Sequence, residues 1–276
     1  MSYQNMTEEE LKEYLQVYFT TMAEKENNLL LFKNDSHEIY ILGTIHDGHF
    51  EKEGNHIVLD HPAGKNHPAG RTRATSSGYS LANVQSVIET VKPDVLMIEA
   101  NSEVLEKFNT VDGPIEMIFA RCCADELGIP VKGIDWCFPV KNSEARAALY
   151  LERDDRMFEN ILSAVDGYGR GLVLCGAGHR IEMPERFIKN GYSQIEINNI
   201  HDYFTRISNP FKYPKRIVEE YNDNINYYKT HYLEEVKRRV SPNDEFYEYY
   251  TKGEPEEAKE YRQKLIEIMT ENKLHR

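Results

Sequence analysis

Two strand-like segments of this chain end in the same pattern, in which a glycine is followed three residues later by a histidine. Residues 38–46 end in Gly-Thr-Ile-His, and residues 172–179 end in Gly-Ala-Gly-His. In an open α/β sheet, ligands bind in the crevice outside the carboxyl ends of the strands. We therefore expect His46 and His179 at one edge of a sheet, where a functional site would lie.

The order of the predicted elements indicates the fold class. Helical periodicity and short apolar segments alternate from residue 80 onward, after a predicted β-hairpin. The hairpin strands are expected at 29–32 and 39–42, further strands at 94–99, 131–136, 171–176 and 193–197, and helices at 80–91, 114–127, 142–165 and 180–190. This alternation predicts an α/β fold with a mostly parallel or mixed sheet flanked by helices.

The change in composition along the chain predicts an N-terminal domain and a C-terminal extension. Residues 1–200 form the expected α/β catalytic domain, which begins with a predicted helix over 7–24. Within it, residues 47–79 are polar and without periodicity, which predicts a lid loop beside His46. Residues 201–276 are rich in tyrosine and predicted to be helical, and we expect them to pack on the sheet domain. A cap over the site and a homodimer surface are alternatives for this extension.

Charge and composition narrow the class of partner and the location. The chain of 276 residues has a formal net charge of −13, which disfavours binding to nucleic acid. Its apolar runs are too short to cross a bilayer, and its first residues lack the pattern of a signal peptide. The four cysteines show no C-x-x-C pairing. We therefore expect a cytoplasmic protein with reduced thiols that acts on a small-molecule or peptide substrate.

Several carboxylates accompany the two histidines. Glu99 ends an otherwise apolar predicted strand, and a carboxylate there either meets water or needs a partner. Together with His46 and His179 it makes a set typical of a metal or acid–base site. Asp135 is placed similarly at the end of the next strand, and Glu116 lies early in a predicted helix. The plain alternative is that the histidines only bond to backbone and Glu99 is an exposed strand-end residue.

The order of these motifs resembles the TIKI/TraB superfamily, which is related to erythromycin esterases and to haem-binding ChaN-like proteins. The resemblance covers residues 38–200. It rests on Gly43-Thr44-Ile45-His46, the strand from Pro93 to Glu99, Gly133-Ile134-Asp135, the helix from Arg153 to Met157, and Gly176-Ala177-Gly178-His179. It implies an α/β fold in which paired histidines and a glutamate share one active site.

The resemblance also implies roles for individual residues. His46 and His179 match the two motif histidines, and Glu99 matches the strand-end glutamate. Arg153 matches the arginine of the helix motif, which orients a carboxylate or binds substrate. Members of the group include metal-dependent peptidases and esterases that work without metal through histidine and glutamate.

These observations favour a hydrolase that acts on an amide or ester bond. In the metal version, His46, Glu99 and His179 hold a divalent transition metal (Zn, Mn or Co), which lowers the pKa of a bound water to about 7. Glu99, Glu116 or Asp135 then accepts the proton of that water. Arg153, in a helix predicted over 142–165, stabilises the developing oxyanion in the same scheme.

Other mechanisms remain open at this point. In the metal-free version, His46 deprotonates water with Glu99 as its partner. A different class is a haem- or metal-binding protein without catalysis, in which the histidines ligate the iron or the metal. A third is an interaction module whose functional surface is the extension 201–276.

Overall fold

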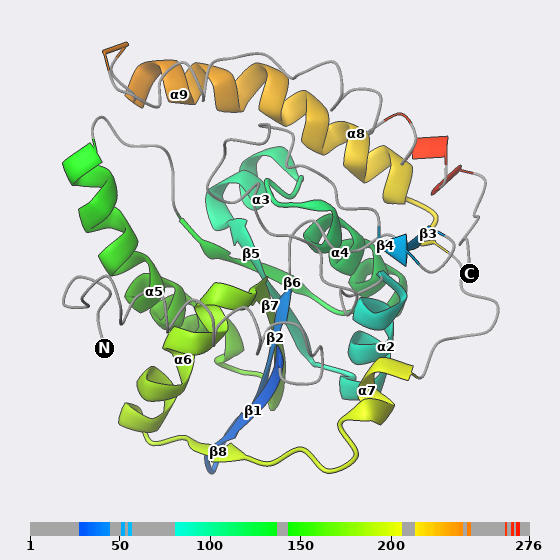
Figure 1. Ribbon diagram of the computed structural model, residues 1–276, viewed down its shortest axis with the longest axis vertical. Helices are drawn as coiled ribbons and strands as arrows, with labels where there is room; N and C mark the ends of the chain where they lie inside the picture. Colours follow the sequence, from blue (N-terminus) through cyan, green and yellow to red (C-terminus); the bar gives the residue numbers. More distant parts are fainter. Residues whose placement is uncertain are drawn as a thin grey trace.

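The computed structural model describes residues 28–44, 51–52, 55–56, 81–136, 143–205, 213–239 and 242–243, and the single residues 263, 266, 267, 269 and 270. Within these ranges the chain forms a six-stranded sheet between two layers of helices (Figure 1). The α/β fold class and the flanking helices that the sequence predicts are therefore confirmed.

The sheet is mixed, with parallel strands at its centre. Its strands are β1 (Leu29–Lys33), β2 (Glu38–Thr44), β5 (Val95–Asn101), β6 (Val131–Asp135), β7 (Arg170–Gly176) and β8 (Ser193–Ile195). Their order across the sheet is β6-β5-β7-β2-β1-β8. Strands β6, β5, β7 and β2 are parallel, whereas β1 pairs antiparallel with β2 and with β8.

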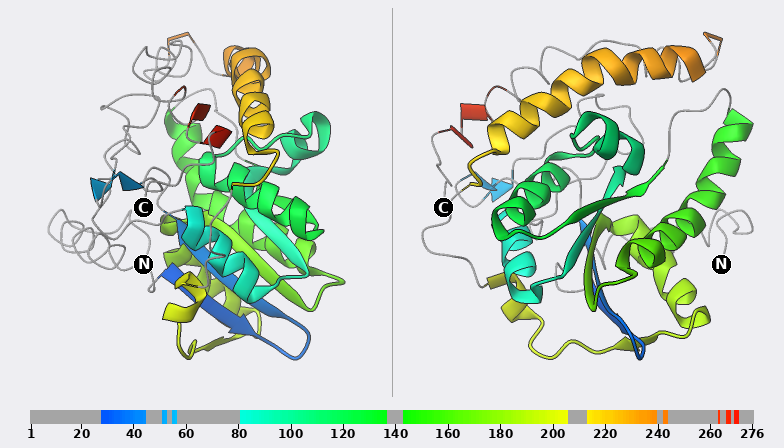
Figure 2. Two further views of the ribbon diagram at one scale, coloured as in Figure 1. Left: turned by 90° about the vertical axis from the view of Figure 1, so that its right-hand side faces the viewer. Right: turned by 180° about the vertical axis from the view of Figure 1, so that it is seen from behind.

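Helices cover both faces of this sheet. They are α2 (Leu81–Val91), α3 (Ser102–Phe108), α4 (Ile115–Leu127), α5 (Ser143–Val165), α6 (Ala177–Lys189), α7 (His201–Thr205), α8 (Ile217–Tyr227), the π-helix η4 (Tyr228–Tyr232) and α9 (Leu233–Arg239). Helices α5 and α6 lie on one face and α2, α4 and α7 on the other, as the views in Figures 1 and 2 agree. Among the described helices, none combines the length and the apolar character needed to cross a membrane.

Strand β5 shows how the two faces are divided. Val95 and Met97 belong to the core beneath α5 and α6, whereas Leu96 and Ile98 belong to the core beneath α2 and α4. Successive side chains of a strand point to opposite faces. Glu99 therefore follows Val95 and Met97 onto the side of α5 and α6.

The predicted hairpin and the pairing of β2 with β7 bring the two glycine–histidine motifs together. Strands β1 and β2 pair from Leu29 opposite Leu42 to Lys33 opposite Glu38, which confirms the hairpin. Strand β2 then runs parallel to β7, and the last pair of that register is Thr44 with Gly176. The carboxyl ends of the two strands that carry the motifs are thus neighbours in the sheet.

The described part of the C-terminal segment shares a core with the sheet domain. The guanidinium of Arg121 on α4 lies 2.7 Å from the carboxylate of Glu220 on α8, and both side chains are buried. The amide of Asn224 donates to the carbonyl of Val111 at 2.5 Å. Apolar residues of the segment join the core under α2 and α4: Phe204, Tyr213, Ile217 and Met269.

Two predicted strand ends differ from the structure by two residues, and one helix was not predicted. Strand β5 does not end at Glu99 but continues to Asn101, because the side chain of Asn101 caps α3 by accepting the N–H of Glu103 at 2.9 Å. Helix α3 was not predicted. Strand β8 ends at Ile195, two residues earlier than expected.

Most of the predicted lid lies outside the described residues. The exceptions are β3 (Glu51–Lys52) and β4 (Asn55–His56), which pair antiparallel where no regular structure was expected. The predicted helix over 7–24 is also outside the described residues, as is most of the helix expected near the C-terminus.

Candidate functional site

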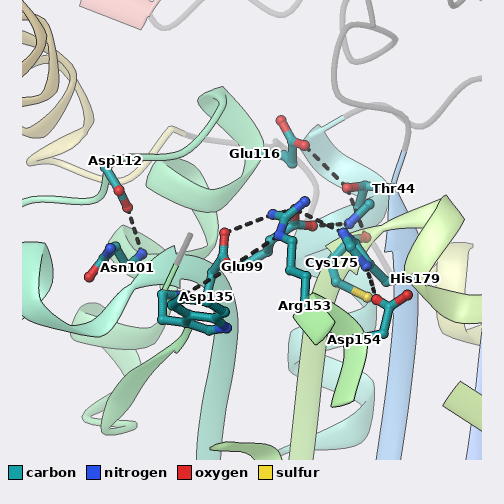
Figure 3. A network of polar contacts seen from close by, with 12 residues as sticks. Thr44, Glu99, Asn101, Asp112, Glu116, Asp135, Arg153, Asp154, Cys175 and His179 are labelled. Carbon is teal, nitrogen blue, oxygen red and sulfur yellow. Dashed lines mark hydrogen bonds and ion pairs between the residues drawn. The ribbon is translucent and has the colours of Figure 1, made fainter. Parts of the chain in front are cut away.

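Five charged side chains meet at the carboxyl edge of the central strands (Figure 3). They come from four elements: Glu99 from β5, Asp135 from β6, Arg153 and Asp154 from α5, and His179 from the first turn of α6. All five are mostly shielded from solvent. The structure therefore brings together four residues that the sequence singles out, Glu99, Asp135, Arg153 and His179, and adds a fifth.

Glu99 is the centre of this network. Its Oε1 accepts Nη2 of Arg153 at 2.6 Å and faces Nε2 of His179 at 3.2 Å. Its Oε2 accepts the backbone N–H of Gly176 at 2.5 Å, at the start of α6. Only 9% of the Glu99 side chain is exposed, so these three donors replace the water that a carboxylate otherwise binds.

Arg153 is held mainly by Asp135. Its Nε and Nη2 donate to the two oxygens of that carboxylate at 3.1 and 2.7 Å. This parallel pair is the geometry in which guanidinium and carboxylate bind most strongly. The backbone N–H of Trp136 also donates to Asp135, at 2.8 Å. The guanidinium is thus fixed at the end of β6 while it reaches across to Glu99.

His179 is held between two carboxylates. Its Nδ1 lies 2.5 Å from Oδ1 of Asp154, on the side opposite Glu99. Burial by itself lowers the pKa of His179, but the charge of Glu99 and the hydrogen bonds to Asp154 and Glu99 outweigh it and raise the pKa to about 10. The two carboxylates therefore favour the imidazolium form of the ring, in which both nitrogens carry a proton.

The packing of α5 explains where Asp154 points. The buried apolar residues of this helix in the core under α5 and α6 include Met157, Phe158, Ile161 and Val165. Asp154 lies three and four residues before the first two, so it continues the same helix face to the edge of the sheet. Asp155, one position on, leaves this face and is 67% exposed.

A close approach of α6 to β2 places His179. A Cβ at Gly43 would lie 2.9 Å from the Cα of Ala177, so only glycine allows this contact. Helix α6 begins at Ala177 rather than near residue 180 as predicted. His179 consequently lies within the first helical turn instead of in a loop after the strand.

Glu116 reaches the same edge from the opposite helix layer. It is fully buried on α4, and its carboxylate accepts the hydroxyl of Thr44 at 3.1 Å. Thr44 lies at the end of β2 and also approaches the carbonyl of Cys175 at 3.3 Å. Of the two additional carboxylates that the sequence proposes as proton acceptors, Asp135 thus pairs with Arg153, and Glu116 with Thr44.

His46 lies outside the described residues. The chain places it two positions after Thr44, whose partner in the sheet is Gly176. Of the expected triple, the structure tests only Glu99 and His179, and these two are in contact.

Two carboxylates of this region were not among the predicted site residues. The composition of residues 152–157 suggests a solvated helix face, but Asp154 is only 18% exposed and bonds His179. Its spacing from Met157 and Phe158 is the signal that could have identified it. Asp112 accepts the backbone N–H of Asn101 at 2.7 Å, and burial raises its pKa to about 6. No sequence pattern marks Asp112.

The donors described around Glu99 do not fit a divalent metal as they are arranged. Arg153 already donates to Oε1 of Glu99 and brings positive charge to the atom that a cation would bind, and His179 faces the same oxygen. The part of the chain that the structure describes contains no group of three histidine, cysteine, aspartate or glutamate residues arranged to hold an ion.

Comparisons of the chain with protein-family models, with curated proteins and with solved structures found no match.

Proposed function

We propose that the protein is a hydrolase of ester or amide bonds, with its reaction centre at the network around Glu99. The observation that supports this most is the convergence of two cations, Arg153 and the His179 imidazolium, on one carboxylate at the carboxyl edge of the sheet. Donors fixed in advance in a partly buried site stabilise the negative charge that develops on a carbonyl oxygen.

Each residue takes a distinct role in this proposal. The contact of 3.2 Å between His179 and Glu99 is the longest of the three described here for the Glu99 carboxylate, and it is the one that a substrate oxygen replaces. Nε2 of His179 then donates to the oxyanion, supported by the charge of Arg153. Because three donors engage Glu99, we assign it as an orienting carboxylate rather than as the base.

The proton acceptor is assigned to His46 from the sequence, two positions after Thr44. Water adds to the carbonyl carbon, and His46 accepts the proton that the water loses. The same proton passes to the leaving alcohol or amine when its bond to carbon breaks. Of the two versions that the sequence leaves open, the contacts at Glu99 favour the metal-free one.

Hydrolysis of chromogenic substrates by the purified full chain tests this proposal. We would assay nitrophenyl esters of short acids and nitroanilides of amino acids with His179→Asn and Arg153→Met. Loss of a donor to the oxyanion lowers kcat by about 100-fold or more. Asp155→Asn and Arg186→Met are the matched controls, because they remove an exposed ion pair between the same two helices.

Two results would contradict the proposal. One is the absence of turnover above the blank by the wild-type protein on every ester and amide tested. The other is wild-type turnover in His179→Asn at wild-type folding stability.

A further inference from the structure

Asp154 belongs to the network around Glu99 but takes no part in the reaction proposed above. It contacts neither the predicted substrate position nor Glu99 through any described bond. Its described partner is His179, at 2.5 Å from Nδ1. This inference rests on the proposed function, in which Nε2 of His179 faces the substrate.

Two contacts at opposite corners define the orientation of an imidazole. Asp154 holds Nδ1 and Glu99 faces Nε2, so the plane of the His179 ring is fixed by carboxylates from α5 and β5. When a substrate oxygen replaces Glu99 at Nε2, the Asp154 contact is the one that remains. A histidine of a reaction centre usually depends on such a partner on its second nitrogen for its orientation.

The position of Asp154 is itself rigid. The residue continues the buried face of α5 that Met157 and Phe158 anchor, and it is 18% exposed. The rotamer of a carboxylate in such a place is restricted by packing, unlike that of Asp155 beside it, which is 67% exposed.

We propose that Asp154 is a positioning residue, which holds His179 through Nδ1 so that Nε2 stays directed at the reacting carbonyl. Asp154 itself does not touch the substrate. Replacement by asparagine keeps the size of the side chain but removes the charge that pairs with the imidazolium. The ring then loses the partner that fixes its orientation at Nδ1.

Proton NMR of the full chain tests this without any substrate. A ring N–H that donates to a carboxylate resonates far downfield of the amide region and exchanges slowly with water. We expect such a signal in the wild-type protein, assigned by its absence in His179→Asn. It should disappear or move strongly upfield in Asp154→Asn, return in part in Asp154→Glu, and be unchanged in Asp155→Asn.

The second test measures kcat and KM on the substrate that the wild-type protein hydrolyses. Asp154→Asn should lower kcat by at least about tenfold with little change in KM, and Asp154→Glu should recover part of the loss. A folded Asp154→Asn protein that keeps the downfield signal, or that keeps wild-type kcat after losing it, overturns the proposal. If the wild-type protein hydrolyses none of the substrates, the proposed function fails, and the NMR result still decides whether Asp154 holds His179.

Discussion

Arg153 binds Asp135 through two hydrogen bonds, 3.1 Å from Nε to Oδ1 and 2.7 Å from Nη2 to Oδ2, and the same Nη2 donates to Glu99 at 2.6 Å. One guanidinium therefore joins α5 to the carboxyl ends of β6 and β5. The folding stability of this edge should depend on it, since removing one partner leaves the charges of the others buried and unpaired.

Arg153→Met should lower the free energy of unfolding by about 3 kcal/mol, because two carboxylates lose their cation. Arg153→Lys should recover only part of this, because an ammonium cannot form the two parallel bonds. Urea titration of both variants measures the difference. Arg186 is the control because its partner Asp155 is 67% exposed, and Arg186→Met should change stability by less than about 1 kcal/mol. Equal stability of Arg153→Met and wild type would contradict the prediction.

Stability should depend on pH through His179. Burial opposes the charge of the His179 ring, but Glu99 and Asp154 raise its pKa to about 10 in the folded protein, from 6.5 in the unfolded chain. A raised pKa means that the stabilisation is fully present below pH 6.5 and is lost as pH rises toward 10. The free energy of unfolding should fall by up to about 1 kcal/mol per pH unit in this window.

Urea titrations at several pH values across this window, on the wild-type protein and His179→Asn, check the effect. Subtracting one curve from the other removes the contribution of the remaining titratable groups. A difference that stays constant between pH 6.5 and 10, or that grows with pH, would show that His179 is not held as an imidazolium.

The contact between Arg121 and Glu220 should be needed for α8 to pack on α4. The Glu220 side chain is 1% exposed, and its carboxylate is the partner of a guanidinium that is itself buried. Glu220→Gln removes that charge and should cost about 3 kcal/mol of stability. Glu219→Gln is the neighbouring control, because Glu219 is 65% exposed and pairs only with Arg216 among its described contacts. Thermal unfolding of both variants compares them, and similar melting temperatures would refute the role of the buried pair.

Metal removal distinguishes the two versions of the hydrolase. We expect elemental analysis of the purified protein to find less than one transition metal per chain, and activity to survive dialysis against a chelator. We also expect no Soret band when haem is added. A stoichiometric metal that is lost together with activity would restore the metal version, and a Soret band that depends on His179 would support the haem-binding alternative.

Local patterns were sufficient to predict most of the fold. The hairpin of β1 and β2 follows from two short apolar runs separated by turn-forming residues, and the helix α4 follows from its proline near the first turn and the glycine after its last. Gly128 has a φ of 69°, a left-handed conformation that favours glycine at a helix end. These features depend on residues that are close together in the chain, so local sequence patterns are enough to predict them.

The parts that the sequence did not predict depend on contacts between distant segments. Residues 176–178 are glycine, alanine and glycine, which predict a loop, but α6 begins at Ala177 because it packs against Gly43 on β2. Local composition predicts that Asp154 is solvated, whereas in the structure α6 places His179 beside it. Glu99 was identified as a site residue because a carboxylate at the end of an apolar strand needs a partner, although the sequence did not reveal which partner.

Arg153 and Asp154 are consecutive residues of α5, yet Arg153 binds Glu99 directly, whereas Asp154 binds His179, which in turn faces Glu99. Adjacent positions on a helix are about 100° apart, so the two directions are coupled by the geometry of one turn. Insertion or deletion of a single residue between this turn and the Met157 anchor would rotate both side chains away at once. A change in helix register therefore removes two contacts together, that of Arg153 with Glu99 and that of Asp154 with His179.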